Sequence, residues 1–247
     1  MERKNFLKSL MIGAVSTTVL VEACKKDADT ATATSSTSGS SSSGSSSSGS
    51  TDSGSCSVAP TETEGPYPTH SPASYVRSDI TDGRTGYKLT VKITINNSNN
   101  SCNALSSALV DIWHCDAAGN YSEYGGIGSQ STNYTSVHFL RGRQTTDTNG
   151  LVTFTSIFPG WYTGRATHIH VHVYNATGTS LKVTQIAFPE GTGTALAAVN
   201  GYSKGMSGYT YNANDGIFSD GYSLELASVT GNTTDGFVLS INFSVPA

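Results

Sequence analysis

The part of the chain after residue 56 alternates apolar and polar residues with a period of two. Over residues 87–95, Leu89, Val91, Ile93 and Ile95 fall on one face of an extended chain, and Lys or Thr residues fall on the other. This alternation of β-branched residues is typical of a strand that is buried on one face. The same pattern predicts further strands over 108–114, 151–155, 167–174, 181–188 and 236–245.

Turn signals and the lack of a long helical pattern indicate the fold class. Tight-turn sequences lie between the predicted strands, at Asp82-Gly83, Thr148-Asn-Gly150 and Asp235-Gly236. Helical periodicity is confined to residues 195–199. Short strands joined by such turns predict an all-β domain, either a sandwich or a barrel. Long loops are expected over 115–150 and 189–235, and long loops in compact β domains tend to carry the functional site.

The beginning of the chain resembles an export signal rather than part of a fold. Basic residues occur within 1–8, an apolar stretch covers 10–21, and Ala23 precedes Cys24. Residues 1–23 are therefore predicted to be a signal peptide. The Ala-Cys junction resembles a bacterial lipobox, which implies that Cys24 is lipidated. The protein is then expected to be exported and anchored to a bacterial membrane, on its periplasmic or cell-surface face. An ordinary cleaved signal with an incidental Cys is the alternative.

A low-complexity segment separates this signal from the rest of the chain. Residues 24–55 are rich in Ser and Gly, and 14 of the 21 residues from 35 to 55 are Ser. Such a segment has no apolar surface to offset the entropy of ordering it, so a disordered, flexible tether is predicted. The remaining residues, 56–247, have a suitable length for a single domain.

The charge balance excludes some partners. The chain has 14 Lys and Arg against 18 Asp and Glu, a formal net charge of −4. Residues 1–55 contain five of each sign, so the whole net charge belongs to the domain. No basic cluster follows residue 26, and nucleic-acid binding is therefore not expected. No apolar run reaches the roughly 18 residues of a membrane span, so membrane contact is expected through the lipid alone. An oligomer is compatible with these features.

Three histidines alternate along one predicted strand. In residues 167–174, His168, His170 and His172 share one face, while the apolar residues between them face the core. Two neutral imidazoles on one strand can bind the same metal ion where the strand twists. A polar outer face that happens to carry three histidines is the alternative interpretation.

Five short motifs occur together with this strand. They are Thr63-Glu-Gly-Pro-Tyr67, Asp111-Ile-Trp-His-Cys-Asp-Ala-Ala-Gly-Asn-Tyr121, Phe139-Leu-Arg-Gly142, Pro159-Gly-Trp-Tyr162 and Gly164-Arg-Ala-Thr-His-Ile-His170. In kind and in order they resemble the motifs of the intradiol ring-cleavage dioxygenases, which include the catechol and protocatechuate dioxygenases and their secreted relatives. The resemblance covers about residues 60 to 245.

The resemblance implies a fold, a cofactor and a set of metal ligands. The fold is an antiparallel β-sandwich whose loops carry a mononuclear non-haem Fe(III). The implied ligands are Tyr121, Tyr162, His168 and His170, and His172 has no ligand role in the family. Fe(III) is a hard cation that prefers phenolate and imidazole ligands to thiolate. A phenol with an ordinary pKa of about 10 ionises at neutral pH only where a cation stabilises its anion.

The resemblance also implies a reaction and further site residues. The ring of a catechol-type diol is cleaved between its two hydroxyls by O2, giving a muconate-type diacid. Tyr162 takes a proton from the diol, Arg165 stabilises anionic character on the substrate by its fixed charge, and Gln185 matches a polar residue of the site. Tyr67 and Trp113 are weaker candidates for the wall of the substrate pocket. Small catechols, hydroxyquinols and fragments of plant phenolics all remain possible substrates.

Two other functions are compatible with these sequence features. A lipid-anchored β-sandwich could be a binding module without catalysis, or the His-rich strand could hold Zn or Cu in a different metallo-enzyme. Both Tyr residues and the spacing of Arg165 favour the dioxygenase.

For an exported domain, a disulfide between Cys102 and Cys115 is expected, which would leave Cys56 free.

Overall fold

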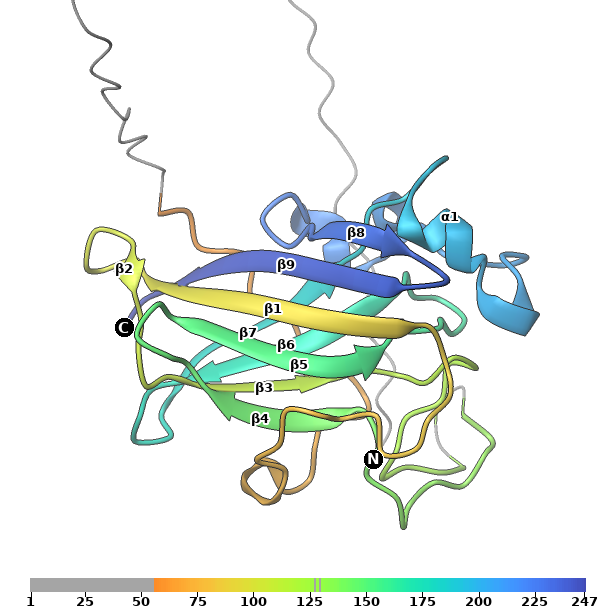
Figure 1. Ribbon diagram of the computed structural model, residues 1–247, viewed down its shortest axis with the longest axis horizontal. Helices are drawn as coiled ribbons and strands as arrows, with labels where there is room; N and C mark the ends of the chain where they lie inside the picture. The colour runs from red at the N-terminus through yellow and green to blue at the C-terminus, as the bar shows by residue number, and fades with distance from the viewer. Residues whose placement is uncertain (1–55, 127, 129) are drawn as a thin grey trace, which may run out of the picture. The chain divides into compact units, whose positions relative to one another are not determined.

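The computed structural model of the protein describes residues 56–247, except 127 and 129 (Figure 1). The signal peptide, the lipidation site at Cys24 and the Ser/Gly tether, all predicted within residues 1–55, lie outside the described residues. In the part of the chain that the structure describes, no helix is both long and apolar enough to cross a membrane.

The described residues form mainly strands, as the alternating pattern predicts. The strands are β1 (Lys88–Asn97), β2 (Asn103–Ala104), β3 (Leu109–Trp113), β4 (Arg141–Thr145), β5 (Leu151–Ile157), β6 (His168–Tyr174), β7 (Ser180–Ala187), β8 (Ser228–Asn232) and β9 (Gly236–Val245). The helical elements are α1 (Ala195–Val199) and the 3₁₀ helices η1 (Pro72–Ser74), η2 (Tyr202–Lys204), η3 (Asn212–Asn214) and η4 (Ile217–Asp220). Helix α1 lies where helical periodicity is found, and the Thr194 hydroxyl caps it by accepting the Ala197 N–H.

The strands form two stacked sheets (Figure 1). One sheet has the order β2-β1-β9-β8, with β5 also paired to β1, and the other has the order β4-β3-β6-β7. Strands β1 and β9 are parallel, and the other pairs of named strands are antiparallel. The predicted all-β fold is thus confirmed, and of its two forms the sandwich is the one observed.

The core lies between the sheets and consists of the apolar positions of the alternating pattern. In β1, Leu89, Val91, Ile93 and Ile95 are fully buried, while the residues between them are exposed or half-buried. The facing sheet contributes fully buried Val and Ile side chains from β3 and β6. Burial of each of these side chains stabilises the fold by roughly 1.5–3 kcal/mol.

Strand β6 is unusual because both of its faces are buried. Its apolar residues face the core, and its histidines lie on the outer face of the sheet, where they remain at most 8% exposed. Residues 61–67 cover this outer face. The Glu62 N–H donates to the Val183 carbonyl at 3.0 Å, and the Gln185 side chain donates to the Thr63 carbonyl at 3.1 Å. The histidines therefore line a covered space rather than a solvated surface.

Two strands lie inside the predicted long loops. Strand β4 interrupts residues 115–150, and β8 interrupts 189–235. Neither segment shows apolar alternation: β4 is Arg-Gly-Arg-Gln-Thr, and β8 is a largely exposed edge strand. Residues 115–140 and most of 189–227 lie at the end of the sandwich where α1 is also found, whereas the short β4–β5 turn over 146–150 lies at the other end, next to β2 (Figure 1).

The predicted disulfide is wrong. Cys56 is bonded to Cys102, with Cα atoms 5.6 Å apart, and Cys115 is a buried free thiol. Cys115 follows β3 into the interior beside Tyr121, whereas Cys102 lies in the turn between β1 and β2. The bond therefore fastens the start of the described chain to the β1–β2 turn.

A buried carboxyl group lies beside the end of β7. Thr184 Oγ1 donates to Glu225 Oε1 at 2.6 Å, and Glu225 Oε2 is buried with no hydrogen-bond partner among the described residues. Burial raises the pKa of Glu225 to about 7, and the negative charge of Glu62 adds to the shift, while the Thr184 hydrogen bond opposes it. An acid whose pKa is raised on folding stabilises the protein below its unfolded pKa and loses that contribution as the pH rises through the folded pKa.

We predict that Glu225→Gln stabilises the protein at alkaline pH but not at acidic pH. The isosteric amide keeps the acceptor for Thr184 and removes the cost of ionising a buried carboxyl. Relative to the unchanged protein, the gain in free energy of unfolding should rise by up to about 3 kcal/mol between about pH 4 and about pH 8. Denaturant unfolding across this range measures it, and a difference independent of pH would contradict the prediction.

Candidate active site

Two imidazoles converge at the start of β6. The Nε2 atoms of His168 and His170 lie 3.2 Å apart. Both side chains are buried, because the covering segment and the neighbouring strands enclose them. His168 Nδ1 lies 2.6 Å from the Ala166 carbonyl, which can only accept, so the proton is on Nδ1 and Nε2 keeps its lone pair. This tautomer is the one that binds a metal through Nε2.

The second imidazole is held by packing. The rings of His170 and Trp113 stack with centroids 4.8 Å apart and planes inclined by 1°. On another side, a Cβ at Gly65 would lie 3.0 Å from His170 Cε1, and Gly65 has a φ of +68°, which disfavours any other residue. His170 Nδ1 is buried with no hydrogen-bond partner among the described residues. Its orientation therefore depends on the shape of its surroundings.

A phenol reaches the imidazole pair from a loop. Tyr121 is fully buried, and its hydroxyl lies 3.2 Å from His168 Nε2. The Tyr121 N–H donates to Gln130 Oε1, and Gln130 Nε2 donates back to the Tyr121 carbonyl. Gly119, with a φ of +90°, precedes Tyr121 in a tight turn that presses against the Trp161 carbonyl. These contacts fix the phenol although no regular element carries it.

A second phenol lies across from the first. The rings of Tyr121 and Tyr162 are 5.8 Å apart in an edge-to-face arrangement, and Tyr162 packs similarly on His168 at 5.7 Å. The Tyr162 hydroxyl is buried and makes no hydrogen bond of ordinary geometry among the described residues, although Arg165 and Tyr121 are its polar neighbours. Buried polar atoms are rarely left unpaired in native proteins, so this one indicates a missing partner.

Burial keeps all four side chains neutral in the absence of a metal ion, even beside the Arg165 guanidinium. It raises the pKa of Tyr162 to about 12, although the Arg165 charge opposes the shift, and it raises the pKa of Tyr121 well above its ordinary value. Burial also lowers the pKa of His168 and His170 well below the usual range, with the Arg165 charge contributing. The imidazoles therefore present free lone pairs, and the phenols ionise only beside a strong positive charge.

These four residues fit a metal ion. Metal–N and metal–O bonds of about 2.0–2.2 Å place neighbouring donor atoms roughly 3 Å apart, close to the observed 3.2 Å separations. Among the described residues no group of three or more His, Cys, Asp or Glu could hold a metal. The phenols of Tyr121 and Tyr162 are the further donors beside the two imidazoles, and phenol oxygen with imidazole nitrogen is a donor set that suits a hard cation.

An arginine lies at the edge of the four residues. Arg165 Nη1 is 3.3 Å from His168 Nε2, and Arg165 Nη2 donates to Gln185 Oε1 at 2.6 Å. Arg165 Nε donates to the carboxylate of Asp215 at 2.9 Å, and the same carboxylate accepts the Ala166 N–H. Asp215 has a fully buried side chain. The guanidinium is thus fixed from two sides.

The aromatic side chains expected in the wall are also near the site. Tyr67 stacks on Tyr121 with centroids 4.7 Å apart and lies edge-on to Tyr162 at 6.2 Å. Trp113 lies behind His170. The sequence candidates Tyr121, Tyr162, His168, His170, Arg165, Gln185, Tyr67 and Trp113 therefore gather in one region.

The third histidine of β6 lies apart from this cluster. His172 Nε2 is 2.8 Å from Ser180 Oγ, and His172 Nδ1 is 2.9 Å from the Tyr174 hydroxyl and 3.0 Å from Glu64 Oε1. Its ring nitrogens are occupied by these partners, so it joins the covering segment to the β6–β7 hairpin.

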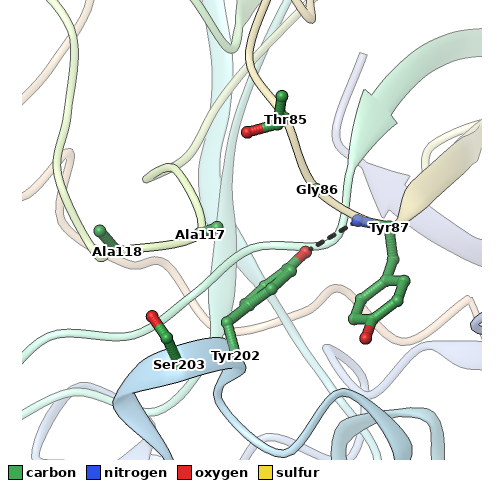
Figure 2. A pocket seen from close by; sticks show the side chains of 7 residues that line it. All are labelled: Thr85, Gly86, Tyr87, Ala117, Ala118, Tyr202 and Ser203. Atoms are coloured by element: carbon green, nitrogen blue, oxygen red, sulfur yellow. Dashed lines mark hydrogen bonds between the residues drawn. The ribbon is translucent and has the colours of Figure 1, made fainter.

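A separate pocket lies beside the loops that carry the two phenols. It has a volume of about 430 Å³ and is lined by Thr85, Gly86, Tyr87, Ala117, Ala118, Tyr202 and Ser203 (Figure 2). The Tyr202 hydroxyl accepts the Tyr87 N–H and donates to the Phe158 carbonyl. Tyr202 thereby supports the segment that leads to Tyr162, and none of the four converging residues lines this pocket.

Comparison with known proteins identifies the family. A family model described as "Dioxygenase" matches residues 63–200. An intradiol ring-cleavage dioxygenase from Tetranychus urticae is 30% identical, with 77% of this chain and 96% of that chain covered and a TM-score of 0.67. The chain therefore belongs to the intradiol ring-cleavage dioxygenases and is an oxidoreductase.

Other solved structures are similar over the same region. The dioxygenase domain of a dioxygenase–carbohydrate-binding protein fusion from Streptomyces sp. SirexAA-E is 25% identical, covering 76% of this chain and 97% of that one, with a TM-score of 0.55. A 3-chlorocatechol 1,2-dioxygenase from Rhodococcus opacus 1CP supports the fold alone, at 21% identity, 76% and 72% coverage and a TM-score of 0.51. No curated protein matches the sequence.

Three residues near the site are absent from the sequence predictions. Asp215 holds Arg165, Gln130 holds the backbone of Tyr121, and Arg141 is a fully buried arginine beside Tyr67. Asp215 and Gln130 lie within the predicted loops, and the composition of these loops indicates only turns. Arg141 is part of a motif that supports the family resemblance, but its burial has no sequence signal.

We predict that Asp215→Asn lowers both stability and turnover. An amide offers one acceptor oxygen where the carboxylate uses two, and its NH₂ would face a backbone N–H or the guanidinium. Loss of a buried charge partner costs about 3–5 kcal/mol, and the released Arg165 should lower kcat/KM of the folded fraction.

The matched control is Asp111→Asn, which weakens the ion pair between the buried Asp111 on β3 and the half-buried Arg143 on β4. It should cost similar stability and leave kcat/KM of the folded enzyme unchanged. Equal kcat/KM in both variants would show that Asp215 does not act through Arg165.

Proposed function

We propose that the domain binds one non-haem Fe(III) through Tyr121, Tyr162, His168 and His170. The observation that supports this most directly is the convergence of one phenol oxygen and two imidazole nitrogens within 3.2 Å of their neighbours. The unpaired hydroxyl of Tyr162 beside them is the second. Zn and Cu remain less suitable, because two phenols are the donors of a hard trivalent cation.

We further propose that the substrate is a small catechol-type diol. The C–C bond between the two hydroxyl-bearing carbons is broken, both atoms of O2 enter the product, and a muconate-type diacid is formed. When bound, the ferric ion supplies the Lewis acidity that holds the diol oxygens as anions and allows the ring to react with O2. The site is lined mainly by aromatic rings, as a planar aromatic substrate requires.

The protein side chains handle the proton and the charge. Because burial raises the pKa of Tyr162 to about 12, its phenolate is a strong base. It takes one of the two hydroxyl protons of the diol at its Oη atom. Arg165 cannot lose a proton, so it stabilises anionic oxygen on the ring by its fixed charge. Gln185 orients the guanidinium, and Tyr67 and Trp113 exclude water.

The colour of the protein tests the metal. Tyrosinate-to-Fe(III) charge transfer gives a red to brown protein, whereas a zinc-bound or metal-free protein is colourless. We predict that His168→Ala loses iron and colour together, and that His172→Ala, the matched control from the same strand, keeps both. A fully metallated, coloured His168→Ala protein would refute the ligand assignment.

The role of Tyr162 is tested by Tyr162→Phe. We expect this variant to retain most of its iron, because three ligands remain, and to lose at least about 100-fold in kcat/KM, the usual contribution of a positioned base. Iron content and oxygen uptake with a panel of catechols measure the two effects. Uptake equal to that of the unchanged enzyme would remove Tyr162 from the mechanism. No uptake by the unchanged enzyme with any diol would favour a binding module.

We also propose that lipid on Cys24 anchors the domain outside the cytoplasm through the tether of residues 24–55. The support is the sequence of the first 24 residues. Cys24→Ala should move the exported protein from the membrane pellet to the soluble fraction. Retention in the pellet would show that another feature holds it there.

A further inference from the structure

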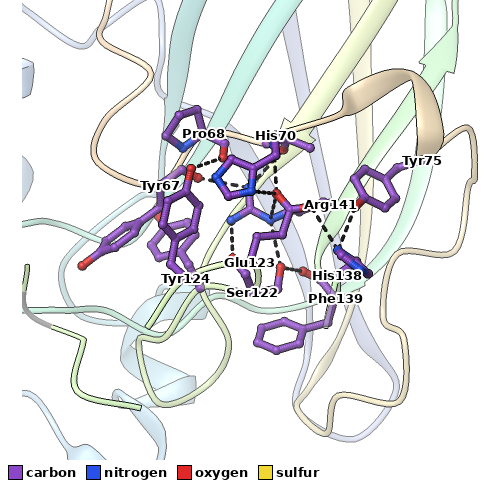
Figure 3. A network of polar contacts seen from close by, with 12 residues as sticks. Tyr67, Pro68, His70, Tyr75, Ser122, Glu123, Tyr124, His138, Phe139 and Arg141 are labelled. Atoms are coloured by element: carbon purple, nitrogen blue, oxygen red, sulfur yellow. Dashed lines mark hydrogen bonds and ion pairs between the residues drawn. The ribbon is translucent and has the colours of Figure 1, made fainter. Parts of the chain in front are cut away.

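A buried arginine lies beside the proposed iron site, with its guanidinium carbon 6.0 Å from the centre of the Tyr121 ring. Arg141, the first residue of β4, has 0% exposure. Its guanidinium makes four hydrogen bonds (Figure 3). Nε donates to Ser122 Oγ at 2.8 Å, Nη2 to the Ser122 carbonyl at 2.6 Å, and Nη1 to the Tyr67 carbonyl and Thr69 Oγ1 at 3.0 Å each.

All four acceptors belong to two short segments, 67–69 and 121–123. These segments are far apart in the sequence, and each carries a ring of the site. Tyr67 stacks on Tyr121 at 4.7 Å, and Ser122 directly follows Tyr121. The guanidinium therefore links the backbone at Tyr67 to the backbone at Ser122, the residue after Tyr121. The Tyr121 hydroxyl lies 3.2 Å from His168 Nε2, so a shift of this backbone would move a proposed ligand.

The positive charge of Arg141 is balanced by a carboxylate. Glu123 Oε2 lies 3.5 Å from Arg141 Nε. The Glu123 carboxylate also accepts the Tyr75 hydroxyl at 2.6 Å and the His70 N–H at 2.9 Å, and it lies 3.1 Å from His138 Nδ1 (Figure 3). Both Arg141 and Glu123 thus have several hydrogen-bond partners, and these bonds keep the two side chains in one arrangement.

Stability alone does not require this arrangement. Replacing a buried ion pair by apolar residues of similar volume is often neutral or stabilising. A planar fork with five fixed donors, by contrast, sets the relative position of two backbone segments as no apolar side chain or lysine can. The acceptors of Arg141 are all in the segments that carry Tyr67 and Tyr121, and none is in the core between the sheets.

We propose that Arg141 is a positioning residue that holds Tyr121 as an iron ligand and Tyr67 as a wall for the diol. This role rests on the proposed iron site. Because Tyr67 stacks on Tyr121, loosening of these two segments should weaken binding of the diol as well as of the iron.

The test compares Arg141→Met, Arg141→Lys and Arg143→Met. Arg143 is a matched control, because it lies two residues along the same strand and bonds to buried Asp111 instead. Iron titration, the position of the charge-transfer band, KM for catechol and thermal denaturation are measured for each. We expect both Arg141 variants to lose about 10–100-fold in iron affinity, shift the band and raise KM. Arg143→Met should lose stability only.

Each outcome separates the two proposals. An unchanged protein that takes up no iron and shows no colour would defeat the proposed function. A coloured unchanged protein, with Arg141→Met differing from it only in melting temperature, would defeat the positioning role alone. Full rescue by Arg141→Lys would also defeat it, because charge rather than the fork would then suffice.

If Arg141→Met yields no folded protein, the double variant Thr69→Val with Ser122→Ala is used. It removes two of the four acceptors and leaves the guanidinium and its charge in place. A band shift and a weaker iron affinity in this variant would support the positioning role. A band and an iron affinity equal to those of the unchanged protein would overturn it.

Discussion

The site depends on the two-residue period of β6. Ile169, Val171 and Val173 are fully buried in the core, which forces His168 and His170 to the opposite face. Because β6 is paired on both sides, with β3 and β7, its backbone cannot move without disrupting two ladders. The imidazole pair is therefore the rigid part of the site. Everything else has to be brought to it.

The loop residues are held by bonds that do not follow any periodic pattern. Gln130 holds Tyr121 through its backbone, Asp215 and Gln185 hold Arg165, and the Arg141 guanidinium joins the segments of Tyr67 and Tyr121. The same region keeps buried polar atoms without partners among the described residues, at Tyr162, His170 and Trp113. Three of the six such atoms among the described residues belong to this site, and a sequence optimised for stability alone would pair or remove them.

The sequence predicts the parts of the fold that obey a period. The alternation over 87–95 and 167–174 locates β1 and β6 to within two residues, because one face of each strand is apolar. It misses the two-residue strand β2, it misses β4, whose Arg141 is buried by hydrogen bonding rather than by the hydrophobic effect, and it misses β8, which is an exposed edge strand. The same periodicity predicts that the imidazoles of His168 and His170 lie on one face of β6. The tyrosines come from the family resemblance, since no spacing along the chain connects residue 121 to the start of β6.

The sequence does not reveal contacts between residues that are far apart along the chain. Several such contacts support the site from outside the range that the family model matches. The family model matches residues 63–200, and that range contains all four proposed ligands. Arg165 nevertheless depends on Asp215, which is outside it, and β9 provides the parallel partner of β1. At the other end, the Cys56–Cys102 bond fastens the chain that leads to the segment over the β6 histidines. The contacts around the two imidazoles therefore extend beyond the matched range, to Asp215 on the C-terminal side and to the segment that follows Cys56 on the N-terminal side.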